Sequence, residues 1–313
     1  MGEIICIVGP TASGKTKLSI ALARAMGAEI ISFDSMQIYR HMDIGTAKPT
    51  PEERLAAPHH MLDFLDPKEA YSVGRYVQEA DACLQGILSR GKPVILVGGT
   101  GLYIDSLMAG RSFAPTPASG RREELTALAD AEGIEAVLAQ LRLVDPEAAQ
   151  TLHPSNRKRI IRAMEVYLET GKTITAHNAE TKALPPKYQP LWIGLDFEDR
   201  NALYARINRR VEAMFAQGLA SEVQALLDAG VPERATSLQA IGYKEILAAL
   251  RSGAPAETAR EEIALRSRRY AKRQLTWFRR NRAVSWLQVD RYANFDTLFN
   301  EIWQIRLDST SKS

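Results

Sequence analysis

The chain has 313 residues, 45% of them hydrophobic and 25% charged, with a formal net charge of +3. This length and composition allow a large domain plus a smaller one, and we find no internal repeat or low-complexity tract before the polar tail 308–313. No apolar run approaches the length of a membrane span and no signal peptide precedes the first strand, so we expect a cytoplasmic protein without a membrane partner. Cys6 and Cys83 are isolated, which favours reduced cysteines over a disulfide or a zinc site.

The first predicted strand runs directly into a phosphate-binding pattern. Residues 4–8 form the continuous apolar run of a strand buried on both faces of a parallel sheet. GPTASGKT (9–16) follows, and residues 17–26 have a helical pattern. In this arrangement loop N–H groups and the helix N-terminus surround an anion, Lys15 reaches the terminal phosphates, and the Thr16 hydroxyl can bind Mg²⁺. We predict a phosphate site here in preference to a structural glycine-rich turn.

The next two predicted strands end in polar residues. The strand at 29–33 ends at Asp34, and the strand at 94–97 runs into a glycine-rich loop that contains Thr100; a helix is predicted between them at 73–91. Because ligands bind at the carboxyl ends of strands in open α/β sheets, we expect the phosphate loop, Asp34 and Thr100 to line one crevice. An aspartate at such a position also commonly caps a helix, so its position alone leaves both roles open.

The middle of the chain predicts a helical insertion. Residues 111–120 are rich in Pro, Ser and Gly, helical patterns run from 121 to about 171, and a second linker occupies 183–190. We therefore expect an α/β fold, with a P-loop NTPase-like parallel sheet flanked by helices and an α-helical insertion domain. The expected boundaries are 1–112 and 191–313 for the core domain and 113–190 for the insertion. The expected later elements are a strand at 191–195, helices at 201–227, 238–250 and 257–281, and a strand at 285–290.

The strand ends also bear on how the phosphate is used. An ATP-hydrolysing motor or switch would usually have a second strand ending in acidic residues that serve Mg²⁺ and water, whereas the strand before Thr100 ends in two glycines. A small-molecule kinase stays open, because Asp34 could accept the proton of a substrate hydroxyl.

Two basic segments point to a nucleic acid. Residues 263–289 contain eight Arg or Lys and no Asp or Glu. Arg157, Lys158 and Arg159 fall in or near the first turn of a predicted helix, where each cation opposes the helix dipole by about 0.3–1 kcal/mol. Both segments could be solvated surfaces, but uncompensated like charges favour a polyanionic partner.

At this point the sequence resembles the bacterial tRNA dimethylallyltransferases, also called tRNA isopentenyltransferases. The motifs that carry the resemblance occur in the family's order between residues 4 and about 282: GPTASGKT, ISFDSMQIYRHMDIGTAKP, PHHMLDFLDP, YSVGRY, VGGTGLY, LHPSNRKRIIRAMEV, QAIGYKE and RRYAKRQLTWFRR. The C-terminal zinc finger of some eukaryotic relatives has no counterpart here. The five histidines have no matching cysteine pairs, and we expect them not to bind metal.

The resemblance implies a prenyltransferase reaction. The loop would hold dimethylallyl diphosphate, and the enzyme would transfer the dimethylallyl group to the exocyclic N6 amine of the adenosine 3′-adjacent to the anticodon (position 37) of tRNA, releasing diphosphate. It implies Asp34 as general base, Thr100 as a second catalytic residue, and Mg²⁺ as cofactor on Thr16. The implied diphosphate-binding residues are Gly9, Thr11, Ala12, Ser13, Gly14, Lys15, Thr16, Arg206 and Arg210. The implied tRNA-binding residues are Asp34, Ser35, Met36, Gln37, Thr100, Arg122, Lys158, Arg159, Ile160, Ile161, Arg162, Gln239, Ala240, Ile241, Gly242, Tyr243, Lys244, Lys272, Arg273, Gln274, Leu275, Thr276, Trp277, Phe278 and Arg279.

Three other functions share part of this pattern. A metabolite kinase, or a prenyltransferase acting on free adenine nucleotides, would use the loop and Asp34 but would not need the basic C-terminal region. A non-enzymatic RNA-binding protein would not need Asp34 and Thr100 beside a phosphate loop. We expect a monomer, since no coiled-coil heptad or exposed apolar stripe suggests otherwise.

Overall fold

The computed structural model describes residues 2–111, 113, 119–183 and 185–311. The chain divides into two compact units, Met1–Leu107 with Tyr188–Ser313 (the α/β unit) and Met108–Lys187 (the helical unit). The linker predicted at 111–120 lies mostly outside the described residues, as does one residue of the linker predicted at 183–190.

The described part of the α/β unit contains a six-stranded sheet in the order β3-β2-β4-β1-β5-β6, with every neighbouring pair parallel. The strands are β1 (Ile4–Val8), β2 (Glu29–Ser32), β3 (His59–His60), β4 (Val94–Val97), β5 (Leu191–Asp196) and β6 (Val284–Gln288). The α/β prediction is confirmed, and the five predicted strands are present with ends that differ by at most two residues. The short β3 was missed because two histidines make no apolar run.

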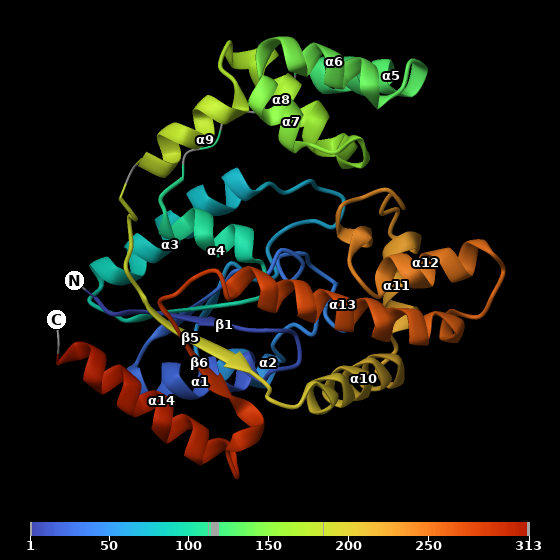
Figure 1. The fold of residues 1–313 in the computed structure, drawn as a ribbon. Coiled ribbons are helices and arrows are strands. Elements are labelled where there is room, and N and C mark those ends of the chain that lie inside the picture. Colours follow the sequence, from blue (N-terminus) through green and yellow to red (C-terminus); the bar gives the residue numbers. More distant parts are fainter. Residues whose placement is uncertain (1, 112, 114–118, 184, 312–313) are drawn as a thin grey trace. The chain divides into compact units, whose positions relative to one another are not determined.

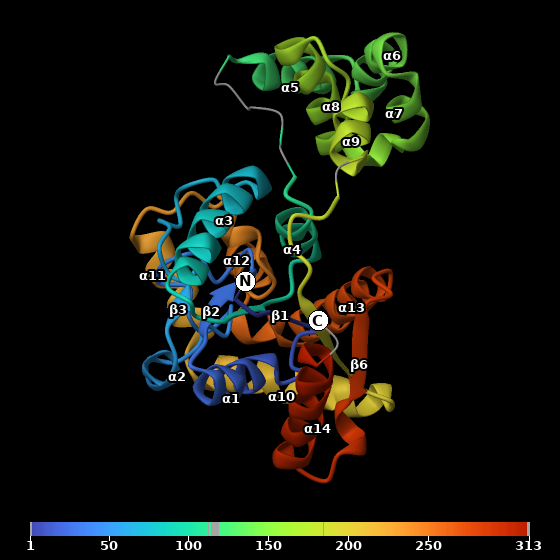
Figure 2. The same ribbon diagram turned by 90° about the vertical axis from the view of Figure 1, so that its left-hand side faces the viewer.

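Helices cover both faces of the sheet (Figures 1 and 2). On one face lie α1 (Lys15–Met26) and α14 (Phe295–Thr310), and on the opposite face lie α3 (Val73–Ser89), α4 (Gly101–Met108) and α13 (Arg260–Phe278). Ile5, Leu18 and Leu298 belong to the core of the first face. On the second face, the rings of Tyr76 and Tyr103 stack with centroids 4.3 Å apart. The sequence analysis missed α14 because this segment ends in polar residues, although one side of the helix is apolar and buried.

A second core lies beside the sheet. It is formed by α10 (Arg200–Ala216), α11 (Leu219–Asp228), α12 (Tyr243–Arg251) and residues of the loop after β2. The helix predicted at 201–227 is divided between α10 and α11, and the one predicted at 238–250 begins only at Tyr243, after a 3₁₀ turn at Ser237–Gln239. The short helix α2 (Pro51–Ala56) and further 3₁₀ turns at Ala256–Ala259 and Val289–Arg291 complete the described unit.

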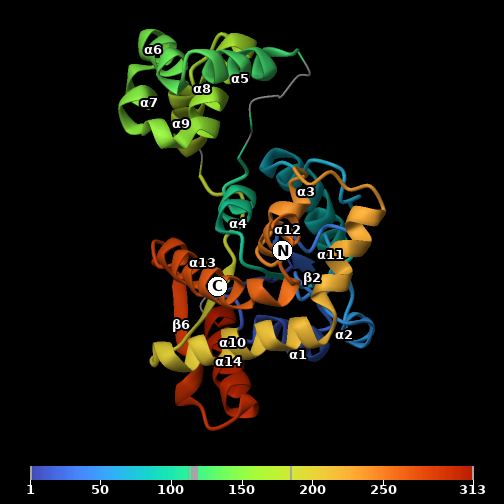
Figure 3. The same ribbon diagram turned by 90° about the vertical axis from the view of Figure 1, so that its right-hand side faces the viewer.

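The helical unit contains, in its described residues, α5 (Arg121–Ala131), α6 (Ile134–Val144), α7 (Pro146–Thr151), a 3₁₀ turn (Pro154–Asn156), α8 (Arg157–Thr170) and α9 (Ile174–Ala183) (Figure 3). Val137, Leu141 and Ile160 are fully buried in its own core. Buried Asp145 caps α7 through the N–H of Ala148 and also accepts hydrogen bonds from Thr175. Among all described helices, none has the length and apolar character needed to cross a membrane.

Candidate active site

The strand order brings three loops together at one edge of the sheet. Because β2, β4 and β1 are parallel neighbours, the segments that follow them leave the sheet on the same side. The Phe33 N–H donates to the Val97 carbonyl (2.9 Å), and the Thr100 N–H donates back to the Phe33 carbonyl (3.3 Å). A cavity of about 510 Å³ opens here. Its lining includes the phosphate loop from Thr11 to Thr16, Asp34, Gln37, Gly98, Gly99, Arg206, Arg210, Tyr270 and Gln274.

The phosphate loop joins β1 to α1. The helix begins at Lys15, two residues earlier than predicted, so Lys15 and Thr16 form its first turn. The Lys15 ammonium donates to the carbonyls of Gly9 (3.0 Å) and Pro10 (2.6 Å). The Ser13 hydroxyl is buried and has no hydrogen-bond partner within the described chain. A buried, unpartnered hydroxyl at a helix N-terminus fits an anion whose oxygens accept hydrogen bonds there.

Cationic side chains from α10 enter the same cavity. The Arg206 guanidinium donates to the carbonyl of Ala12 (2.9 Å), while Arg210 reaches the carbonyl of Thr46 (3.5 Å). Burial and, to a smaller extent, the positive charge of Arg210 lower the pKa of Lys15 to about 7, against the opposing effect of Asp34. Burial also lowers the pKa of Arg210. Because several cations are crowded here with limited solvent, the cavity favours a multiply charged anion.

Asp34 lines this cavity, and it caps a turn and not a helix. One carboxylate oxygen, Oδ1, accepts the N–H groups of Met36 (2.9 Å) and Gln37 (3.3 Å) and so organises the turn after β2. The other oxygen, Oδ2, makes no hydrogen bond to any described residue. Thr100 does not line the 510 Å³ cavity. Its hydroxyl accepts the Ser35 N–H (3.1 Å) and donates to the Ser35 hydroxyl (3.2 Å), which supports the same turn.

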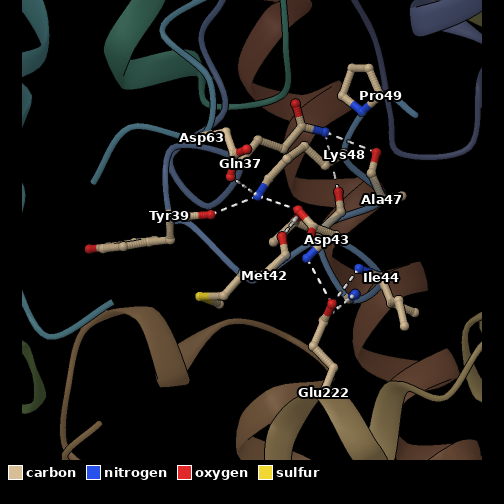
Figure 4. Close-up of polar contacts among 12 residues, drawn as sticks. Gln37, Tyr39, Met42, Asp43, Ile44, Ala47, Lys48, Pro49, Asp63 and Glu222 are labelled. Atoms are coloured by element: carbon tan, nitrogen blue, oxygen red, sulfur yellow. Dashed lines mark hydrogen bonds and ion pairs between the residues drawn. The ribbon is translucent and has the colours of Figure 1, made fainter. Parts of the chain in front are cut away.

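A buried lysine holds the loop that continues from this turn (Figure 4). The Lys48 ammonium donates to the Tyr39 carbonyl (2.7 Å), to Asp43 (2.5 Å) and to Asp63 (2.7 Å), and only 1% of the Lys48 side chain is exposed. Asp63 has a positive φ of 60°, a strained conformation that persists only where the surroundings enforce it. The sequence analysis missed Lys48, because a single lysine in a loop gives no signal of burial.

A carboxylate from α11 holds the same loop from another side (Figure 4). Glu222 accepts the N–H groups of Asp43 (2.8 Å), Ile44 (2.8 Å) and Gly45 (3.1 Å), together with the Tyr243 hydroxyl (2.5 Å). A Cβ atom at Gly45 would collide with the Tyr243 ring, so this position needs glycine. No local pattern in the sequence indicates Glu222, since the three backbone N–H groups that it accepts lie 177–179 residues away.

The predicted tRNA-binding residues include both buried and exposed side chains. The side chains of Ile160, Tyr243, Leu275 and Phe278 lie in hydrophobic cores with at most 6% exposure, which leaves their exposed neighbours as candidates for RNA contact. The exposed residues of the predicted set are Arg122, Lys158, Arg159, Gln239, Lys272, Arg273, Thr276 and Arg279.

Two arginines of the predicted tRNA-binding set form ion pairs within the helical unit. Arg122 and Arg162 each pair with the buried carboxylate of Glu165 at 2.8 Å. Glu165 therefore holds two cations in place on the surface of α5 and α8. This acidic residue was missed because it falls inside an otherwise basic segment.

Family profiles and curated relatives match nearly the whole chain. The profile described as IPP transferase matches residues 37–281, and the one described as isopentenyl transferase matches residues 2–63. The tRNA dimethylallyltransferase of Thermoanaerobacter sp. is 45% identical over 302 residues, covering 96% of each chain. That of Geobacter sulfurreducens is 46% identical over 296 residues, covering 95% of this chain and 94% of the relative.

Solved structures give the same result. The full-length tRNA isopentenylpyrophosphate transferase of Bacillus halodurans aligns with a TM-score of 0.72 and 39% identity, over 100% of this chain and 99% of that one. A eukaryotic dimethylallyltransferase, described as acting on tRNA, aligns with a TM-score of 0.79 and 28% identity, over 92% of this chain and 74% of that one.

Proposed function

This chain belongs to the IPP transferase family of tRNA dimethylallyltransferases, and from that premise we propose how its cavity transfers a dimethylallyl group from dimethylallyl diphosphate to N6 of adenosine 37 in tRNA. One observation carries the proposal: a cation-lined phosphate loop and an aspartate with an unpaired oxygen line the same cavity. The loop suits the leaving group, and the aspartate suits the proton of the nucleophile.

The donor side is built from the phosphate loop and α10. We assign the diphosphate to the loop amides, the Ser13 hydroxyl, Lys15, Arg206 and Arg210. As the bond between the allylic carbon and oxygen breaks, its electron pair leaves with the diphosphate, whose negative charge grows. Cations already fixed at that position stabilise this developing charge more than they stabilise the intact donor.

The acceptor side is built from the turn after β2. A second cavity of about 310 Å³ shares Asp34 and Arg210 with the first, and its lining combines apolar side chains such as Met36 and Ile241 with polar ones such as Lys244. We place the adenine there, unstacked from the tRNA. As N6 bonds to the allylic carbon, its proton passes to Oδ2 of Asp34. Thr100 keeps this turn in position through Ser35.

The donor side of the cavity would bind Mg²⁺ together with the diphosphate. Thr16 lies in the cavity lining, and no group of three or more His, Cys, Asp or Glu in the described chain could form a metal site. The chain would therefore supply the Thr16 hydroxyl, with diphosphate oxygens and water as the other ligands, as is common for Mg²⁺. Bound Mg²⁺ would neutralise part of the diphosphate charge.

We assign tRNA binding to the insertion domain, residues 113–190, and to α13. Lys158 and Arg159 are exposed on α8, and Lys272 and Arg273 are exposed on α13. Charges of this kind contact phosphates and position the RNA. We place the protein in the cytoplasm as a monomer, because the proposed substrate is tRNA and neither proposed cavity needs a second copy.

A transfer assay separates this function from its alternatives. Radiolabelled dimethylallyl diphosphate is supplied with unmodified tRNA or with AMP, with and without EDTA. We expect label in tRNA only, and little transfer with EDTA.

Asp34→Asn should cut the single-turnover rate by about 10²–10⁴-fold while tRNA affinity changes only several-fold. Label in AMP would favour a nucleotide prenyltransferase, and rapid ATP hydrolysis a kinase. Normal turnover by saturated Asp34→Asn would make Asp34 a binding residue.

A further inference from the structure

Gln274 on α13 makes contacts that its predicted role in RNA binding does not explain. Only 4% of Gln274 is exposed. Its Oε1 accepts the N–H of Thr11 in the phosphate loop (2.8 Å), and its Nε2 donates to the carbonyl of Gly99 in the loop after β4 (3.1 Å). One side chain thus connects the donor loop to the loop that carries Thr100, across 263 and 175 residues of sequence.

The surroundings are shaped to keep this amide in place. A Cβ atom at Gly99 would collide with the Gln274 amide, so glycine is required for the close approach. Tyr270, one turn earlier on α13, donates its hydroxyl to the same Gly99 carbonyl (3.4 Å). Trp277, on the next turn, donates its ring N–H to Asp105 of α4 (2.8 Å). This face of α13 is therefore fixed at several points against the phosphate loop, the loop after β4 and helix α4.

We propose that Gln274 is a positioning residue for prenyl transfer and does not contact RNA. In this role its amide fixes the position of the phosphate loop relative to the loop that contains Thr100. The proposal rests on the proposed function. The chemistry requires an amide, because one end must accept the Thr11 N–H and the other must donate to the Gly99 carbonyl. A shift of the donor loop relative to the turn around Asp34 would misalign the allylic carbon and N6, and misalignment of about 1 Å can cost about 10²-fold in rate.

Two substitutions test the hydrogen bonds of the Gln274 amide. Gln274→Met has a similar shape and removes both hydrogen bonds. Gln274→Glu keeps an acceptor for Thr11 but removes the donor to Gly99, and it places a negative charge beside the diphosphate loop. Gln304→Met is the matched control, because Gln304 is exposed on α14, away from the cavity lining.

Three measurements test the assignment. They are kcat and KM for dimethylallyl diphosphate, the Kd of inorganic diphosphate, and the Kd of tRNA at several salt concentrations. For Gln274→Met we expect kcat/KM to fall about 10–100-fold, with tRNA affinity and its salt slope within about two-fold of the parent. Gln274→Glu should also weaken diphosphate binding, whereas the Gln304→Met variant should match the parent.

Two results would overturn the proposal while the parent remains active. One is transfer at parental kcat/KM by a folded Gln274→Met variant. The other is weakened tRNA binding with a normal single-turnover rate at saturating tRNA, which would make Gln274 an RNA contact. If Gln274→Met does not fold, Gln274→Leu, which also removes both hydrogen bonds and adds no charge, decides the same question through the same three measurements. An inactive parent would instead contradict the proposed function.

Discussion

Lys15 is a cation in a position that disfavours its charge. Burial, and then the neighbouring Arg210, lower its pKa to about 7, so at pH 8 only about one tenth of the free protein has this lysine charged. A bound diphosphate favours the charged form and raises the pKa again. The protein should therefore take up a proton when it binds diphosphate above pH 7, and its affinity should fall as the pH rises further.

Calorimetry in buffers of different ionisation enthalpy measures this proton uptake. We expect Lys15 to take up close to one proton for each diphosphate bound at pH 8–9 and almost none below pH 6. Lys15→Arg is the control, because arginine stays charged throughout this range and both proteins share the titration of diphosphate itself. Equal proton uptake by the parent and Lys15→Arg would show that Lys15 is already charged before diphosphate binds.

At the scale of elements, the loop after β2 depends on α11 and α12 for its shape. Glu222 accepts three backbone N–H groups and the Tyr243 hydroxyl, so a change at either residue acts on one hydrogen-bond network. Glu222→Gln should destabilise the fold by about 1–3 kcal/mol, because an amide NH₂ would face backbone donors. Tyr243→Phe should cost about 1 kcal/mol.

Urea unfolding of both single variants and the double variant checks this network. We expect the double variant to lose less than the sum of the single losses, with a coupling of about 0.5–3 kcal/mol. Glu301→Gln, an exposed carboxylate on α14, should change stability by less than about 0.5 kcal/mol. Strictly additive losses for Glu222 and Tyr243 would mean that the two side chains stabilise the loop independently.

At the scale of the whole molecule, we expect tRNA binding to depend on charges that the fold leaves unpaired. Lys158 and Arg159 are exposed and form no ion pair in the described chain, whereas Arg122 and Arg162 are held by Glu165. Each phosphate contact contributes about 0.7–0.9 to the slope of log affinity against log salt. Replacing Lys158 and Arg159 by alanine should weaken tRNA binding and reduce the slope by about 1.4–1.8.

Filter binding between low and moderate salt measures this slope. Arg142→Ala with Lys172→Ala removes the same charge from the helical unit, but both residues already pair with carboxylates, Glu135 and Glu180. We expect this control to keep the parental slope, and inorganic diphosphate to bind both double variants equally. If the Lys158 and Arg159 variant keeps the parental slope, the basic cluster on α8 is a solvated surface.

The sequence by itself determined the elements around the cavity and the strand ends where chemistry would lie. The apolar run of β1, the phosphate loop and the polar residues after β2 and β4 are local patterns, and a parallel sheet brings its carboxyl ends to one edge whatever the remaining contacts are. For this reason the sequence could predict that Lys15 and Asp34 line one cavity, whereas Thr100, predicted for the same crevice, supports the turn after β2 and does not line that cavity.

Only the tertiary structure decided which polar side chains face inward. Gln274 falls between lysine, arginine and threonine that are exposed, and its one signal was a polar residue spaced with the buried Ala271 and Phe278 of α13. Lys48, Glu222 and Glu165 carry the same charges as surface residues, and their hydrogen bonds and ion pairs depend on partners in separate elements. Sequence periodicity reports the side of a helix on which a residue lies, but a hydrogen bond between residues 11 and 274 exists only once the two elements have packed together.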